Sequence, residues 1–270
     1  MEKCPLILFS GGLDSTALVY RQLQSGPCDV MYADGGQSVF KIEAELKARR
    51  KIIEYLNSVC PYKVRQDYRI DQHVSLARSP DLRYSQPAAW LFTALMIVDP
   101  EKHSSIQVGY VYDDGGFCRW LPNIERAWIE LQAFSRWGGP IPLEFPLIDL
   151  TKVQLLAAID PELVNMIWVC ETPKYDEPTK QCGKCGPCRK GLAVLVEYKE
   201  TYGHTIYSKI LTTRVARANI GSEWDDKDKR YAGNTASAKC WMEKRMQNVC
   251  EVQATPSRVS RSGDDIKLED

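Results

Sequence analysis

The stretch LILFSGGLDSTALV, near the start of the chain, constrains the fold more than any other part of the sequence. Residues 6–9 form a short, continuous apolar run, which is typical of a parallel strand that is buried on both faces. Ser10-Gly11-Gly12 ends that run, and residues 15–19 continue with helical spacing. The sequence therefore predicts a polar loop between the carboxyl end of a strand and the amino end of a helix, where α/β sheets bind ligands.

Apolar runs alternate with helical stretches along most of the chain, which predicts an α/β fold with a Rossmann-like parallel sheet and crossover helices. The predicted strands cover residues 6–9, 29–33, 64–70, 105–109 and 143–145, and the predicted helices cover residues 40–57, 88–98 and 124–134. From residue 218 the chain is polar and aperiodic, which indicates a C-terminal extension over residues 218–270 that is flexible or binds a partner.

Composition excludes several classes of protein. The apolar fraction of 44% in 270 residues suits an ordinary core, and no apolar run approaches the roughly 18 residues of a membrane span. Because the chain starts without a secretory leader, we expect a cytoplasmic protein. The 35 basic and 35 acidic residues cancel, which disfavours nucleic acid as the main partner. Ten cysteines in such a chain indicate metal binding or catalysis rather than disulfides.

The glycine loop has the chemistry of a phosphate site. Two glycines leave no Cβ in the way, so backbone N–H groups can converge on a phosphate at the positive end of the helix. Asp14 would repel a bare phosphate, which suggests a magnesium ion shared between its carboxylate and a pyrophosphate. The alternative is a tight turn in which Asp14 or Ser15 only caps the helix. The residues predicted to bind the nucleotide are Ser10, Gly11, Gly12, Leu13, Asp14, Ser15 and Thr16.

A second cluster of functional residues lies in the run QCGKCGPCRKG. Cys170 is followed after eleven residues by Cys182, Cys185 and Cys188, and the glycines between them let the chain wrap around an ion. Four thiolates at this spacing suit tetrahedral zinc with a structural role, while an iron–sulfur cluster and free thiols are the alternatives. The cysteines at positions 4, 28, 60, 118, 240 and 250 are expected to be buried, small apolar side chains.

The SGGLDS loop resembles the SGGxDS loop of the ATP pyrophosphatase (PP-loop) superfamily. Together with the four-cysteine cluster, it makes the chain similar to the 7-cyano-7-deazaguanine synthase (QueC) family over about residues 3–200. Further segments match the family in the same order, namely Asp34-Gly35-Gly36-Gln37, Gly109 to Asp114, Cys118-Arg119, and Pro146-Leu147 with Lys152. The resemblance implies a PP-loop core over residues 1–165 and a zinc-binding helical region over residues 166–217.

The resemblance also implies an activity and its participants. The chain would be an ATP-dependent C–N ligase that uses Mg²⁺ with ATP, adenylates the carboxylate of 7-carboxy-7-deazaguanine, and forms an amide and then a nitrile with ammonia. Asp14 and Lys152 would be catalytic, Lys152 by neutralising the ATP phosphates, and Gln37, Asp114 and Arg119 would hold the substrate. A surface lysine at a helix start and an ordinary surface Asp–Arg pair are the alternative interpretations. We expect a homodimer.

One segment departs from the family. Where the family carries PGRN ahead of a helix, this chain has Pro87-Ala88-Ala89-Trp90, and the stretch before Cys118 is shortened. The lost arginine forfeits a bidentate anion contact, for which Arg83 is a candidate replacement. The alternative hypothesis is therefore a QueC-like antiphage-defence paralogue that joins the deazaguanine to an amine of a partner protein. A PP-loop tRNA-modifying enzyme is disfavoured by the neutral charge, and a non-catalytic nucleotide-binding subunit by the presence of Asp14 and Lys152.

Overall fold

The computed structural model describes residues 2–33, 38–70, 86–112, 120–134, 140–173 and 181–203. These residues form a parallel five-stranded sheet in the order β3-β2-β1-β4-β5. The strands are β1 (Cys4–Leu8), β2 (Cys28–Ala33), β3 (Val64–Ile70), β4 (His103–Val108) and β5 (Leu143–Glu144). The five predicted strands and the predicted α/β class are confirmed.

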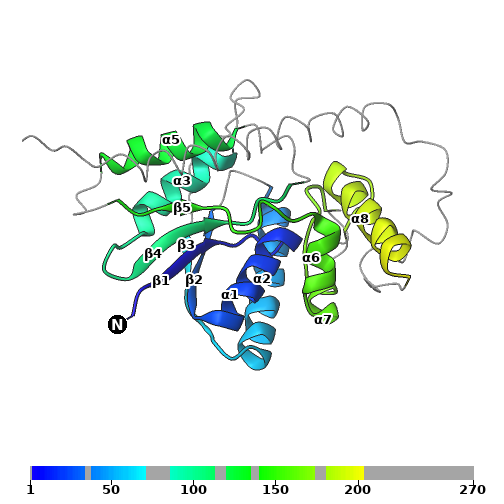
Figure 1. Cartoon of the computed structure of the whole chain (residues 1–270). Coiled ribbons are helices and arrows are strands. Elements are labelled where there is room, and N and C mark those ends of the chain that lie inside the picture. The colour runs from blue at the N-terminus through cyan, green and yellow to red at the C-terminus, as the bar shows by residue number, and fades with distance from the viewer. Residues whose placement is uncertain are drawn as a thin grey trace, which may run out of the picture.

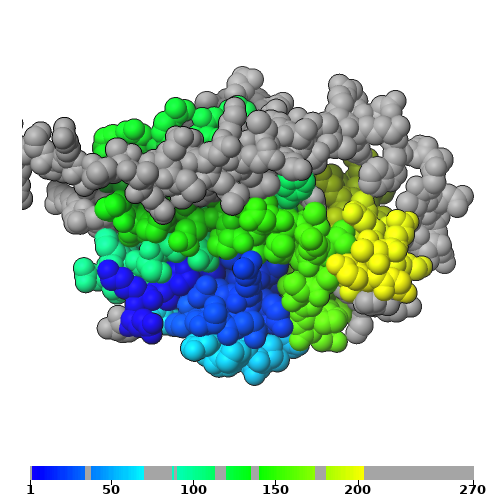
Figure 2. Space-filling view, viewed as in Figure 1, coloured from blue at the N-terminus to red at the C-terminus, as the bar shows by residue number. Residues whose placement is uncertain are grey.

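Helices cover both faces of the sheet (Figure 1). On one face lie α1 (Leu13–Ser25) and α2 (Val39–Val59), and on the other α3 (Gln86–Ile97) and α5 (Leu121–Gln132). Two short helices, α6 (Lys152–Ala158) and α7 (Pro161–Val164), share the core beneath α1. The last helix, α8 (Gly186–Tyr202), lies against α6, as the space-filling view also shows (Figure 2). The three helices predicted by residue range are therefore confirmed as α2, α3 and α5, with shifted ends.

Strand β1 lies at the centre of the sheet, and all of its side chains are buried. Because successive strand residues point to opposite faces, Ile7 and Phe9 pack in the core beneath α1 and α2, while Leu6 and Leu8 pack in the core beneath α3 and α5. Burying an aliphatic side chain of this size contributes about 1.5–3 kcal/mol. The continuous apolar run in the sequence thus reflects two separate cores that share one strand.

The cysteines outside the cluster divide into two groups. Cys4, Cys28 and Cys60 are buried, as expected, and burial raises the pKa of Cys4 to about 11. Cys118, Cys240 and Cys250 lie outside the described residues, as do residues 204–217 and the predicted extension over residues 218–270. The proposed division of the chain at residues 165 and 217 therefore stays a prediction. None of the described helices is long and apolar enough to cross a membrane.

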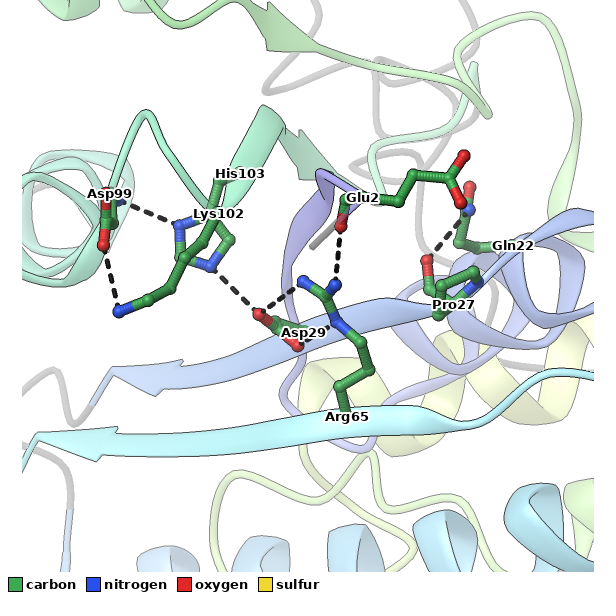
Figure 3. A network of polar contacts seen from close by, with 8 residues as sticks. All are labelled: Glu2, Gln22, Pro27, Asp29, Arg65, Asp99, Lys102 and His103. Carbon is green, nitrogen blue, oxygen red and sulfur yellow. Dashed lines mark hydrogen bonds and ion pairs between the residues drawn. The ribbon is translucent and has the colours of Figure 1, made fainter.

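A buried carboxylate ties the amino ends of the strands together (Figure 3). Asp29 on β2 accepts hydrogen bonds from Nε and Nη2 of Arg65 on β3, both at 3.2 Å. Nε2 of His103 on β4 lies 3.1 Å from Oδ2 of Asp29. Because the backbone N–H of Asp99 donates to Nδ1 of His103, the neutral ring carries its proton on Nε2 and donates it to Asp29. Arg65 also donates to the backbone carbonyl of Glu2.

We expect Asp29→Asn to lower the free energy of unfolding by about 2 kcal/mol at neutral pH, because this buried carboxylate loses charge-assisted hydrogen bonds from His103 and from the partly exposed Arg65. Burial alone would raise the pKa of Asp29, but the bonds from His103 and Arg65 hold it below its ordinary value of 3.8. The stabilisation is therefore fully present above pH 3.8 and is lost as the pH falls through the depressed pKa.

Urea denaturation at several pH values measures the difference between the wild type and the variant. It should be largest near neutrality and shrink in acid below pH 3.8. Asp99→Asn is the matched control, because the side chain of Asp99 forms an exposed ion pair with Lys102. Equal effects of the two changes would contradict the role given to Asp29.

Candidate functional site

A cavity of about 210 Å³ opens at the carboxyl ends of β1, β2 and β4, beside the first turn of α1. The chain runs from β1 to β2 and β3 on one side and continues with β4 on the other side of β1. Such a reversal of strand order leaves a crevice in which open α/β sheets bind their ligands. The cavity is lined by Leu8, Phe9, Ser10, Gly12, Asp14, Ser15, Met31, Tyr32, Ala33, Trp90, Val108, Gly109 and Tyr110.

The glycine loop bends sharply between β1 and α1. Gly11 has a φ of 81°, and a Cβ at this position would lie 3.2 Å from Cγ of Arg49. The Ser15 hydroxyl donates to the Gly12 carbonyl at 3.3 Å, and the Gly12 N–H donates to Oγ of Ser10 at 3.4 Å. The hydroxyl oxygens of Ser10 and Ser15 are 3.3 Å apart. These long bonds link the groups that phosphate oxygens would engage at the start of a helix.

Gly109, directly after β4, lies against the first turn of α1. A Cβ at this position would be 2.9 Å from the carbonyl oxygen of Asp14 and 3.1 Å from the backbone nitrogen of Ser15. No side chain fits in that space, so the sequence needs a glycine here. The close approach sets the end of β4 beside the residues of the predicted phosphate site.

Asp14 and Lys152 meet across the mouth of the loop. Nζ of Lys152 donates to Oδ2 of Asp14 at 2.6 Å, and each side chain is about one-fifth exposed. Lys152 is the first residue of α6, where Thr151 and Gln154 form a capping box. A cation is unfavourable at the positive end of a helix, so the pairing with Asp14 offsets a local cost. The structure thus brings together the two residues that the sequence marked as catalytic.

The other predicted site residues fall into two groups. Ser10, Gly12, Asp14 and Ser15 line the cavity, whereas Gly11 and the buried Leu13 and Thr16 do not. Gln37, Asp114 and Arg119, which were expected to hold the substrate, lie outside the described residues, and so does Arg83. Their roles stay predictions.

Aromatic side chains that the sequence prediction did not assign to the site form one wall of the cavity. Trp90 on α3 stacks on Tyr110 with ring centroids 6.3 Å apart, and Tyr110 stacks on Phe145 at 6.0 Å. Trp90 stands where the related family carries the asparagine of its PGRN segment. Its place near the start of an apolar helix, at a position where the sequence departs from the PGRN segment, was the available signal.

The buried guanidinium of Arg49 contacts the chain at the start of the glycine loop. Arg49 on α2 donates to the Phe9 carbonyl, forms an ion pair with Asp67, and lies 4.8 Å from the centre of the Phe9 ring. Beside it, the Tyr32 hydroxyl donates to Glu45 at 2.6 Å, and burial raises the pKa of Glu45. Glu45 and Arg49 continue the spacing of the buried Ile52 and Leu56 on α2, so two charged residues occupy positions with core spacing.

The four predicted metal ligands converge. The sulfur atoms of Cys170, Cys182, Cys185 and Cys188 all lie within 4.8 Å of one another. Around one tetrahedral ion with metal–sulfur bonds of about 2.3 Å, such atoms would be about 3.8 Å apart. The backbone N–H groups of Lys184 and Cys185 donate to the Cys182 sulfur at 3.4 and 3.3 Å. The donor set therefore fits a single ion held in a tight turn.

The thiols of the cluster differ in acidity. Burial alone would raise the pKa of Cys182, but hydrogen bonds from the Thr172 hydroxyl and from two backbone N–H groups lower it to about 6. Burial raises the pKa of Cys170 to about 11 and also raises that of Cys188. Cys185 is the N-cap residue of α8, and its side chain makes no capping hydrogen bond. Of Cys170, Cys182 and Cys188, Cys182 is therefore the thiol that ionises most readily.

Comparison with known proteins gives one similar curated sequence and a weak structural likeness. No model of a known protein family matches the chain. The chain is 25% identical over 215 residues to a 7-cyano-7-deazaguanine synthase of Thermosynechococcus vestitus (strain NIES-2133 / IAM M-273 / BP-1), a match that covers 71% of this chain and 91% of that protein. A solved structure of the U34-tRNA thiolase NcsA from Methanococcus maripaludis, with its 4Fe-4S cluster, covers 78% of this chain and 70% of its own at 14% identity and a TM-score of 0.44. A likeness this weak supports no inference about the cofactor.

A parallel sheet with a glycine loop at its switch point, followed by an acid and hydroxyls on the first helical turn, is the arrangement that the PP-loop resemblance of the sequence predicts. The match to the synthase and the four-cysteine cluster make the chain similar to QueC-type PP-loop proteins. Its identity of 25% marks a distant relative.

We expect Cys185→Ser to lower metal content and folded yield, with metal affinity falling by at least about tenfold, because a hydroxyl is a poor substitute for a thiolate ligand. Elemental analysis of the purified protein measures this as metal per chain. Cys60→Ser is the control, since Cys60 is a buried thiol that lies outside the cluster. Unchanged metal content in Cys185→Ser would show that the cluster is not the metal site.

Proposed function

We propose that the chain is an ATP-dependent C–N ligase that activates the carboxylate of 7-carboxy-7-deazaguanine as an acyl-adenylate. The observation that carries the proposal is the pair of Asp14 and Lys152 at 2.6 Å, placed beside a glycine loop that borders the cavity. An acid and a base held together at a phosphate loop suit the binding of a nucleotide with its magnesium ion. The match to a 7-cyano-7-deazaguanine synthase supports the choice of acceptor.

The proposed reaction replaces a poor leaving group by a good one. A carboxylate oxygen of the acceptor attacks the α-phosphorus of ATP, and pyrophosphate leaves with the electron pair of the broken P–O bond. An amine then attacks the acyl carbon, AMP leaves with the oxygen, and the nitrogen loses a proton to give the amide. When the amine is ammonia, the amide oxygen attacks the α-phosphorus of a second ATP and pyrophosphate leaves. Loss of AMP, which carries away the amide oxygen, and of both amide N–H protons then gives the nitrile.

The residues of the site would divide this work. The backbone N–H groups of the glycine loop and the hydroxyls of Ser10 and Ser15 would hold the departing pyrophosphate at the amino end of α1. Lys152 would neutralise charge that develops on the phosphates. A magnesium ion bound with ATP would supply a second positive charge, and Asp14 is the carboxylate that would hold it. Trp90 and Tyr110 offer flat apolar surfaces to a planar heterocycle.

For the cysteine cluster we propose zinc in a structural role. The four sulfur atoms lie close enough for one tetrahedral ion, and that leaves no coordination position for a substrate. An iron–sulfur cluster is the second candidate, because its thiolate ligands are the same residue type. Zinc without iron or acid-labile sulfide, in protein purified without air, is the expected result of elemental analysis.

The amine distinguishes two forms of the proposal. Ammonia, the amine of the related synthases, would make the product a nitrile. A larger amine, such as one on a partner protein, is the second candidate, because an arginine and an asparagine of the family are replaced by Ala89 and Trp90. Trp90 lines the cavity, so the substrate wall of this chain is aromatic where the family has an amide. A homodimer stays part of the proposal.

We expect Asp14→Asn to lower pyrophosphate release by at least about a hundredfold while the fold stays intact, because the side chain keeps its size but loses its charge. Release is measured with ATP, magnesium and the carboxy-deazaguanine. Asp149→Asn is the control, since Asp149 is an exposed acid near Lys152 that does not line the cavity. Release at the wild-type rate in Asp14→Asn would leave Asp14 without a catalytic role, as an acid in the first turn of α1.

We further expect the purified chain, given ATP, the carboxy-deazaguanine and ammonium alone, to stall before complete conversion to the nitrile. The reason is that a site reshaped at positions 89 and 90 should favour a larger nucleophile, and an acyl-adenylate without its acceptor hydrolyses in water. Mass spectrometry follows the adenylate, the amide and the nitrile. Efficient conversion to the nitrile with no other protein present would refute the larger amine and leave the synthase reaction.

A further inference from the structure

Residues 167–170 lie between the glycine loop and the cysteine cluster. The backbone N–H of Trp168 donates to the carbonyl oxygen of Gly11 at 2.8 Å. Its indole Nε1–H donates to the carbonyl oxygen of Cys170 at 2.9 Å. One residue thus bonds the phosphate loop through its backbone and the first metal ligand through its side chain.

The indole ring of Trp168 also packs against the cluster itself. Trp168 is 7% exposed and belongs to a small core with Ala44, Ala48, Cys170, Cys182 and Cys188. The two alanines lie one turn apart on α2, and Arg49, the residue after Ala48, lies close against Gly11. The ring is therefore held between α2 and three of the four cysteines, directly beside the loop.

Hydrogen bonds of Gln181 join residues 167–170 to the run that carries Cys182, Cys185 and Cys188. The Gln181 side chain accepts from the Val169 N–H at 3.3 Å and donates to the Ile167 carbonyl at 3.4 Å. The next residue, Cys182, donates its N–H to the Cys170 sulfur at 3.2 Å. Residues 167–170 are thus bonded to the phosphate loop on one side and to the cysteine run on the other.

We propose that Trp168 is a positioning residue through which the metal centre holds the phosphate loop in its nucleotide-binding shape. The inference rests on the proposed function in taking the glycine loop as the nucleotide site and the cysteines as a metal site. Without the metal, Cys170 and the distal cysteines are no longer joined, Trp168 loses part of its packing, and the Gly11 carbonyl loses a fixed donor. Because linkage is reciprocal, bound nucleotide must then stabilise the metal centre by the same factor.

The first test uses the wild-type, metal-loaded protein. The rate of metal release to a chelator is measured with and without a saturating, non-hydrolysable ATP analogue and magnesium. We expect removal of the metal to weaken binding of the analogue by about tenfold, as is typical for coupled sites, and the bound analogue to slow metal release. Release at the same rate in both conditions would overturn the inference, even if the metal-free chain is too unstable for a binding measurement.

The second test compares two tryptophans. Trp168→Phe keeps a buried ring but removes the indole bond to Cys170, so we expect analogue binding to weaken by about threefold or more and metal release to become faster. Trp128→Phe is the matched control, because Trp128 is also buried and donates its indole N–H to the Ile141 carbonyl at 2.7 Å, in the core on the other face of the sheet. It should change neither quantity.

The outcomes separate this inference from the proposed function. A wild-type chain that binds neither a metal at the cysteines nor the analogue would overturn both. A chain that binds both, but with equal effects of the two tryptophan changes on analogue affinity and metal release, would overturn the positioning role of Trp168 and leave the proposed function standing.

Discussion

The contact between Gly109 and the first turn of α1 is the constraint on which the site depends. Backbone atoms of Asp14 and Ser15 lie where a Cβ of residue 109 would be, so the end of β4 is held directly against the start of α1. That contact fixes one wall of the crevice at the point where the strand order reverses. The same first turn carries Asp14, which meets Lys152 from α6. Three segments that are distant in sequence thus converge on one helical turn.

The parts of the fold that could be predicted from the sequence are those with a local cause. An apolar run, two glycines and a resumed helical period lie within one stretch, so β1, the loop and α1 follow from neighbouring residues. The cysteine run was equally local, because three of its four ligands lie within seven residues of one another. The pairing of Asp14 with Lys152 has no local cause, and only the resemblance to a family pointed to Lys152.

Interactions that break the usual patterns could not be predicted. Arg49 is almost fully buried on α2, where the hydrophobic period calls for an apolar side chain, and its partners Phe9 and Asp67 come from two different strand segments. A charged residue at such a position looks like an interruption of the helix pattern until its partners are known. Trp168 was similarly hidden, because its bond to Gly11 uses the backbone, which carries no signature of residue type.

The pairing of Asp14 with Lys152 also affects how the two residues can be studied. Each side chain is mostly shielded from solvent and neutralises the other, so replacing one of them leaves an unbalanced charge beside the cavity. The kinetic loss in a single variant then combines missing chemistry with electrostatic disturbance of the residue that remains. Only a double-mutant cycle separates the two contributions, and non-additivity in that cycle would measure the interaction of the pair rather than the importance of either residue.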